Sequence, residues 1–153
     1  MAPSNLAVVG RYATRATYDQ LHALARAART TVEKRRAYAA MQAALDPALA
    51  AATLALTLGD ELSATEAARN VAAVAANEHA DLAWEFARAH TDELLKRTTF
   101  FGRNAYLPGI ARASTDAPRA DELEALVRAK LPADALAEAA KGADLIRLYA
   151  AVK

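Results

Sequence analysis

The 153-residue sequence contains no cysteine, and it has only five glycines and five prolines. Without cysteine there are no disulfide bonds and no thiolate ligands for zinc. So few glycines and prolines cannot supply the tight turns of a β-sandwich or a β-barrel. No apolar run approaches the ~18 residues of a membrane-spanning helix, and the formal net charge is only +1. The sequence therefore predicts neither a membrane nor a nucleic acid as a partner.

Alanine and leucine dominate what is present. There are 44 alanines and 19 leucines, against only 9 valines and isoleucines together. Alanine and leucine are among the strongest helix formers, whereas β-branched residues favour strands. Hydrophobic residues make up 54% of the sequence and charged residues 24%, which excludes a disordered chain. This composition predicts an all-α protein with close contacts between alanine-rich helices.

Helix-start signals divide the chain into about eight predicted helices. Several starts carry a Ser, Thr or Asp cap, with Glu or Gln three residues later or with Pro directly after it. These caps are Thr17, Thr30, Asp46 and Ser63. The predicted helices cover residues 18–28, 32–45, 48–58, 66–77, 79–97, 104–113, 119–130 and 133–151.

The spacing of these starts predicts how the helices are arranged. Between residues 17 and 63 a start occurs roughly every 15 residues, so two helices form a unit of about 30 residues. Such a unit cannot bury its own apolar stripe and must stack on its neighbours. We therefore expect a right-handed α-solenoid, or superhelix, of helical pairs of the HEAT or armadillo type, with residues 17–153 as a single domain. Only the helix-start signals recur at regular spacing, whereas the residues themselves do not repeat. An irregular helical bundle is therefore the alternative.

Residues 1–16 are expected to be the remnant of a truncated preceding helix. The apolar stretch at residues 6–9 looks like the tail of a helix, and no cap precedes it. A solenoid helix that lacks its neighbour exposes an apolar strip, which favours association. We therefore expect self-association through residues 6–25. The expected contacts are Leu6, Val9, Tyr12 and Leu21.

No catalytic or metal-binding arrangement is recognisable in the sequence. A helical zinc hydrolase needs ligands at fixed spacing, such as His-Glu-x-x-His on one helix face. The three histidines are His22, His79 and His90, and the last two would lie ~16 Å apart on one helix, which is too far to share a metal. Neighbouring carboxylates such as Asp92 and Glu93 suit the first turn of a helix. We therefore predict no catalytic residue and no bound metal in this chain.

One segment carries a specific pattern. Residues 77–97, NEHADLAWEFARAHTDELLKR, resemble the segment N-P-x-x-x-x-L-A-W-x-F-x-x-x-N-W-x-x-L near the end of M1-family zinc aminopeptidases. This group includes aminopeptidase N and the puromycin-sensitive and endoplasmic-reticulum aminopeptidases. The resemblance extends over most of residues 6–153. Glu78 in place of the common Pro, and His90-Thr91 in place of Asn-Trp, indicate a bacterial member and not a close relative of the animal enzymes.

The resemblance implies the fold and the role of a C-terminal helical domain. In the family this domain caps the catalytic domain, encloses the substrate chamber and limits which peptides enter. The zinc cofactor belongs to the catalytic domain, whose His-Glu-x-x-His and Gly-x-Met-Glu-Asn motifs do not occur in this sequence. The expected partners are therefore the catalytic domain of the same polypeptide and a peptide substrate. A free-standing helical-repeat scaffold that binds a protein partner is the alternative.

Candidate peptide-binding residues surround the predicted helix break at residues 98–110. A peptide carboxylate prefers Arg or Lys, and Arg offers a bidentate fork. Four cations meet this requirement, and one tyrosine lies beside them, although charges that only keep the surface soluble are the alternative. These residues are Lys96, Arg97, Arg103, Tyr106 and Arg112.

The same pattern also predicts core residues. Trp84 and Phe86 lie on one amphipathic helix with Leu82 and Leu94. Aromatic residues at helical spacing more often belong to a core than to a ligand platform, and a buried indole N–H requires a hydrogen-bond acceptor. We therefore expect these four side chains to lie at least partly in the core.

Overall fold

A computed structural model describes residues 3–153, which form ten α-helices and two short 3₁₀ helices and contain no strand. This confirms the expected all-α class. None of these helices combines the length and apolarity that crossing a membrane requires. The elements are α1 (Pro3–Arg11), α2 (Arg15–Ala27), α3 (Thr31–Gln42), α4 (Pro47–Ala55), η1 (Leu56–Leu58), α5 (Ala64–Ala76), α6 (Ala80–Ala89), α7 (Thr91–Arg97), α8 (Arg103–Ala111), α9 (Pro118–Lys130), η2 (Ala133–Ala135) and α10 (Leu136–Ala151).

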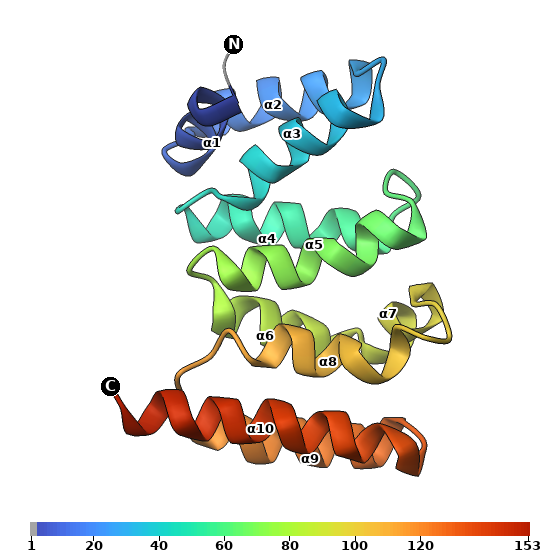
Figure 1. The fold of residues 1–153 in the computed structure, drawn as a ribbon. Coiled ribbons are helices and arrows are strands. Elements are labelled where there is room, and N and C mark those ends of the chain that lie inside the picture. The colour runs from blue at the N-terminus through green and yellow to red at the C-terminus, as the bar shows by residue number, and fades with distance from the viewer. Residues whose placement is uncertain (1–2) are drawn as a thin grey trace.

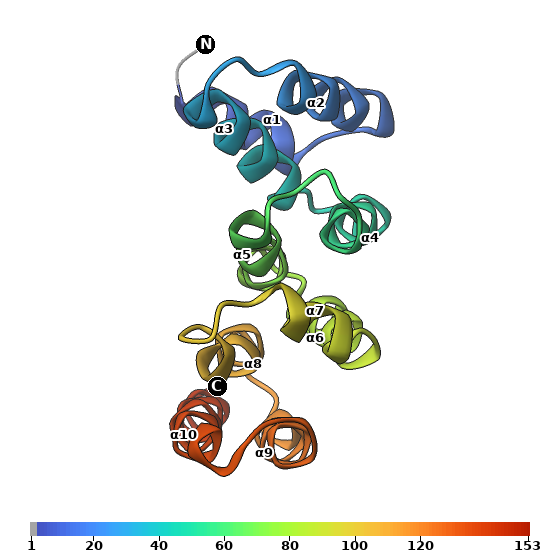
Figure 2. The ribbon, with the colours of Figure 1, turned by 90° about the vertical axis from the view of Figure 1, so that its right-hand side faces the viewer.

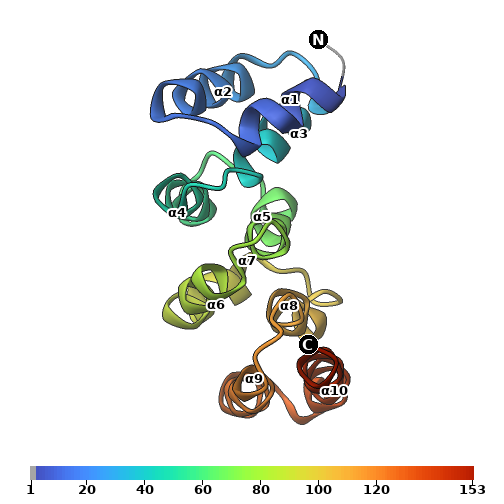
Figure 3. The ribbon, with the colours of Figure 1, turned by 90° about the vertical axis from the view of Figure 1, so that its left-hand side faces the viewer.

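The helices stack into an elongated array that runs from one chain end to the other (Figure 1). The side views in Figures 2 and 3 show two layers, with α2, α4, α6 and α9 in one and α3, α5, α8 and α10 in the other. Helices of the two layers contact each other as pairs: α2 with α3, α4 with α5, α6 with α8, and α9 with α10. The first helix, α1, packs against α3. The described residues therefore form an array of stacked helical pairs and not a bundle around one centre.

Small residues allow the closest helix contacts. A Cβ atom added at Gly10 would lie 2.0 Å from the carbonyl oxygen of Ala40, because α1 crosses α3 at this point. A Cβ atom at Gly142 would lie 3.1 Å from the side chain of Pro108, where α10 meets α8. Because few large side chains separate the helices, packing depends on a small number of large anchors.

The anchors form two buried clusters along the array. Met41 lies in the first cluster, which joins α2, α3 and α4, and Trp84 lies in the second, which extends from α4 to α10. Leu94 is also fully buried, and Leu82 and Phe86 pack against the second cluster while partly exposed. The core residues predicted from the helical spacing are therefore confirmed.

The predicted helix over residues 79–97 is wrong at its centre. The chain forms α6 and α7, with a break at His90. The hydroxyl of Thr91 donates to the carbonyl oxygens of Ala87 at 2.7 Å and Arg88 at 3.1 Å. Threonine hydroxyls that bond to the preceding turn bend helices, so this contact accompanies the break.

The first predicted cap is also wrong, whereas the later caps are confirmed. Thr14, and not Thr17, caps α2, because its side chain accepts a hydrogen bond from the Thr17 N–H at 3.3 Å. Thr30 and Ser63 form complete capping boxes with the glutamates three residues later. Asp46 caps α4 in front of Pro47. The count rises from eight predicted helices to ten because α1 lies in residues 1–16, which were expected to hold a helix remnant outside that count, and because the helix over residues 79–97 breaks at His90.

One expected contact for self-association is excluded by its position. Leu21 lies in the first core cluster and is only 2% exposed, so it cannot contact a second molecule in the folded state. Leu24, one turn further along α2, is 57% exposed, and Tyr12 after α1 is 71% exposed. Leu6 is partly buried against the first cluster.

Candidate functional site

The five predicted peptide-binding residues do not form one cluster. Arg97 donates to the carbonyl oxygens of Gly59 at 2.8 Å and Leu58 at 3.0 Å, at the end of η1. Arg103 donates to the carbonyl oxygen of Leu95 at 3.3 Å. Arg97 therefore joins the end of α7 to the end of η1, and Arg103 joins the start of α8 to α7. Both bind carbonyl groups at helix ends, where cations are favoured.

Lys96 and Tyr106 lie in opposite environments near this loop. The side chain of Lys96 is exposed. Tyr106 is buried in the second core cluster, and its hydroxyl group has no hydrogen-bond partner among the described residues. Burial raises the pKa of the Tyr106 hydroxyl, because the charged phenolate is poorly solvated there. Tyr106 therefore contributes to packing, while Lys96 is free to contact solvent or a ligand.

Arg112 lies at the other end of α8. It follows a nine-residue helix, so its backbone is ~13 Å from that of Arg103 at 1.5 Å per residue. Arg112 is exposed and forms no ion pair with any of the described residues. It lines a hollow between α5, α8 and α10 that we call the α5–α8–α10 groove. The structure thus separates Arg112 from the other four candidates and places it at a different surface feature.

The α5–α8–α10 groove has an apolar floor made of small residues. Its volume is about 660 Å³, which is in the range of ligand sites in proteins. Five alanines and Gly109 line it, together with Leu145 and Tyr149 of α10 and the charged residues Glu78 and Arg112. Leu145 and Tyr149 are 39% and 44% exposed, four residues apart on the same face of α10. The small lining residues would therefore let a ligand come close to the helix backbone. The groove also has an exposed apolar rim and two charged residues.

The two charges of the groove have different surroundings. Glu78 forms an ion pair with Arg11 of α1, whereas Arg112 has no such partner in the described part of the chain. Glu78 follows the end of α5 and has φ of 76°, in the left-handed region that favours glycine or asparagine. Because Glu78 pairs with Arg11, Arg112 is the charge of the groove that has no ion-pair partner among the described residues.

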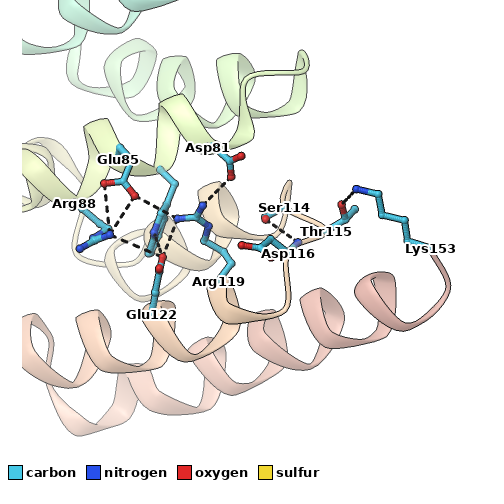
Figure 4. A network of polar contacts seen from close by, with 10 residues as sticks. Asp81, Glu85, Arg88, Ser114, Thr115, Asp116, Arg119, Glu122 and Lys153 are labelled. Atoms are coloured by element: carbon cyan, nitrogen blue, oxygen red, sulfur yellow. Dashed lines mark hydrogen bonds and ion pairs between the residues drawn. The ribbon is translucent and has the colours of Figure 1, made fainter.

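Arg119 organises a polar network that sequence analysis missed (Figure 4). Its guanidinium group donates to Asp81 Oδ1 at 2.7 Å and to Glu122 Oε2 at 2.8 Å. It also lies 5.4 Å from the centre of the Trp84 ring, and its side chain is only 7% exposed. No local sequence signal identifies Arg119, because Asp81 is 38 positions away and lies on another helical pair.

Trp84 is the anchor of this network. Its indole N–H donates to Glu122 Oε2 at 2.9 Å. Arg88 adds ion pairs with Glu85 at 3.1 Å and Glu122 at 4.0 Å. The LAWEF segment, which carries the resemblance, therefore connects α6 with α9 and stabilises the stacking of neighbouring pairs.

The histidines have structural contacts. His22 Nε2 lies 2.5 Å from Glu61 Oε1, His79 Nε2 lies 2.7 Å from the carbonyl oxygen of Ala44, and the His90 ring packs on Phe86. Among residues 3–153 there is no group of three or more His, Cys, Asp or Glu side chains that could hold a metal ion. The described residues therefore offer no set of ligands for the zinc ion that the resemblance associates with a catalytic domain.

The comparisons with known proteins agree with this architecture. The family described as the ERAP1-like C-terminal domain matches residues 2–147, which is nearly the whole chain. No curated protein matches the sequence. The family match covers both layers of the array, from α1 to α10.

Proposed function

The chain belongs to the family of ERAP1-like C-terminal domains of M1 aminopeptidases, and we propose that it is the non-catalytic part of a zinc metallo-aminopeptidase. In this role it encloses the substrate chamber and controls which peptides reach the catalytic domain of the same polypeptide. The zinc ion and the hydrolysis of the first peptide bond belong to that catalytic domain.

The family match carries this proposal, and the lack of metal ligands among the described residues agrees with it. The family match extends over residues 2–147, and the described residues contain no group that could hold a metal. A peptidase reaction needs an activated water and a group that stabilises the developing negative charge, as a zinc ion provides. A chain of this family without metal ligands is therefore expected to act by shaping access to a zinc site in another domain.

The form of the array supports a role as a chamber wall. We take the stacked pairs to form part of a right-handed superhelix of the HEAT or armadillo type, which offers an extended binding surface. The ion pair of the buried Arg119 side chain with Asp81 and the hydrogen bond of Trp84 to Glu122 join the fourth pair to the third, so that neighbouring pairs stay in register. A wall of this kind limits peptide entry by its shape and by a few charges.

The experiment compares the isolated chain with the complete polypeptide that contains it. We expect the isolated chain to bind no stoichiometric zinc and to hydrolyse no aminoacyl substrate. Removal of this domain from the complete polypeptide is expected to preserve hydrolysis of an aminoacyl amide but to change the rates for peptides of increasing length. Peptidase turnover by the isolated chain with bound zinc, or an unchanged length profile, would contradict the proposal.

A second candidate, a free-standing scaffold for a protein partner, is favoured by the α7–α8 loop. Phe100 and Phe101 at the tip of this loop are 85% and 94% exposed, and exposed aromatic side chains are frequent anchors of protein interfaces. The gene distinguishes the two candidates. A zinc-binding His-Glu-x-x-His motif upstream in the same reading frame supports the aminopeptidase, and a stable complex with a separate protein through Phe100 supports the scaffold.

A further inference from the structure

We propose that the α5–α8–α10 groove binds an extended peptide segment and that Arg112 holds the carboxylate of an acidic side chain within that segment. The proposal rests on the proposed function for the peptide nature of the ligand, and its test is independent of any catalytic domain. It predicts a preference for peptides with an internal Asp or Glu.

The glycines of the chain provide the first observation. Gly10 and Gly142 lie at close helix contacts, where a Cβ atom would approach another element within 2.0 Å and 3.1 Å. Gly109 is different, because a Cβ atom at this position would meet nothing within 4 Å. A glycine inside a helix costs roughly 0.5–1 kcal/mol relative to alanine, and no neighbouring element requires it here. Gly109 lines the groove, so its missing side chain leaves space for a ligand.

The charges provide the second observation. Arg112 is exposed on the groove, and no described acidic side chain lies within ion-pair distance of it. Among the described residues that line the groove, Glu78 is the acidic one, and it already pairs with Arg11. A carboxylate that enters the groove therefore meets one available guanidinium group and no uncompensated negative charge. Arg is suited to this contact because its fork can hold both carboxylate oxygens.

The walls of the groove favour an extended backbone. The alanine floor on α5 and α6 has no side chain beyond Cβ, which permits a close approach of a peptide main chain. Leu145 and Tyr149 on the rim offer apolar surface to a neighbouring side chain of the ligand. The occupant that fits all of these features is a peptide with an apolar residue beside an acidic one.

The test uses the 153-residue chain and short peptides with blocked ends. The first probe is acetyl-Ala-Leu-Glu-Ala-Ala-amide, and its matched controls carry Gln or Lys in place of Glu. A fourth peptide carries Gln and a free C-terminal carboxylate, which distinguishes a terminal carboxylate from a side-chain carboxylate. Chemical-shift titration of backbone amides at millimolar peptide detects the weak binding expected of a single short segment and locates it.

We expect the Glu peptide to shift amides in α5, α8 and α10 and to bind about threefold more tightly than the Gln peptide. Arg112→Gln is expected to remove this difference between the two peptides. Arg128→Gln is the matched control, because Arg128 is an exposed arginine on α9 without an ion pair among the described residues.

A second variant blocks the groove without weakening the fold. Gly109→Leu adds a side chain where the space is open, and leucine favours the helix more than glycine does. We expect it to abolish binding of the Glu peptide while the chain remains folded. Ala125→Leu, at an exposed position on α9, is its control and is expected to bind like the wild type.

Three results would overturn the proposal. These are equal binding of the Glu, Gln and Lys peptides, stronger binding of the peptide with the free C-terminus, and unchanged binding by Gly109→Leu. These assays measure binding and not hydrolysis. A negative result here would therefore contradict the peptide site in the groove without contradicting the proposed function, which the rates of hydrolysis against peptide length test separately.

Discussion

The indole N–H of Trp84 donates a hydrogen bond of 2.9 Å to the carboxylate of Glu122, across the junction between α6 and α9. Trp84 is fully buried, and the guanidinium group of Arg119 lies against its ring. This contact joins the third helical pair to the fourth. Trp84 is therefore one of the large buried side chains on which the stability of the C-terminal half of the array depends.

Trp84→Ala is expected to lower the free energy of unfolding by ~3–5 kcal/mol, because it leaves a large cavity and removes the hydrogen bond to Glu122. Urea unfolding followed by circular dichroism measures the change. Phe100→Ala removes an exposed aromatic ring and should change stability by less than ~0.5 kcal/mol. A cost below about 1 kcal/mol for Trp84→Ala would contradict burial of the indole.

Two glycine substitutions should have opposite effects. Gly109→Ala is expected to stabilise the chain by roughly 0.5–1 kcal/mol, since the new methyl group meets no neighbour and alanine favours the helix. Gly10→Ala is expected to destabilise it by ~1–3 kcal/mol, since the methyl group would overlap the backbone of Ala40. Thermal and urea unfolding of both variants check this prediction. Stabilisation by Gly10→Ala would exclude the tight contact between α1 and α3, and destabilisation by Gly109→Ala would contradict the open space at Gly109.

The left-handed backbone at Glu78 predicts a clear order of stability. Glycine adopts φ of 76° without strain, so Glu78→Gly should be as stable as the wild type or more stable by up to ~1 kcal/mol, despite loss of the exposed pair with Arg11. Proline fixes φ near ~−65°, so Glu78→Pro should cost ~3 kcal/mol or more. Denaturant unfolding ranks the two variants, and a stable Glu78→Pro protein would show a different backbone here.

Acid is expected to weaken the junction of the first two helical pairs through Glu61. Burial alone would raise the pKa of Glu61, but hydrogen bonds from Tyr38 and His22 outweigh it and hold the pKa below the ordinary value of 4.5. A carboxyl group with a lower pKa in the folded state stabilises the fold above its unfolded pKa. That contribution is lost as pH falls below 4.5 and through the lower folded pKa.

The measurement for this prediction is the free energy of unfolding as a function of pH. Glu61→Gln should flatten its decline below pH 4.5. Part of the decline should remain, because hydrogen bonds from the backbone and side chain of Ser63 also hold the pKa of Glu66 low against the effect of burial. Glu93→Gln on the exposed face of α7 is the control. Identical curves for Glu61→Gln and the wild type would contradict the prediction.

Exposed apolar side chains at the N-terminal end of the array predict weak self-association. Leu24 and Tyr12 expose apolar surface there. The opposite end also exposes apolar side chains, such as Leu148, but they lie beside the ion pairs of Arg147 with Asp121 and Glu124. We expect sedimentation velocity to show concentration-dependent dimers that Leu24→Glu reduces. Val152→Glu, at an exposed apolar residue of the opposite end, should leave association unchanged. A monomer at all concentrations would exclude this contact.

Local sequence signals determined the all-α class, the capping boxes at Thr30 and Ser63 and the cap at Asp46. These features involve residues within three or four positions of each other, so the sequence alone is sufficient to predict them. The helical spacing also predicted burial of Trp84 and Leu94, because amphipathicity is a property of a single helix. The separate expectation of an exposed apolar strip over residues 6–25 was wrong for Leu21, which is buried and cannot serve as a contact between molecules.

Only the tertiary structure decided which distant residues meet. In the folded chain Arg97 and Arg103 bind backbone carbonyl groups, and Tyr106 is buried. Arg112 lies apart from them on a groove between three helices. The fold also gives Glu78 a φ of 76° that a proline cannot adopt, although the resembling pattern has proline at this position. The contact of Arg119 with Asp81 joins side chains 38 positions apart. Stacking of helical pairs creates these relationships, and no signal within a single helix encodes how its neighbour will be placed.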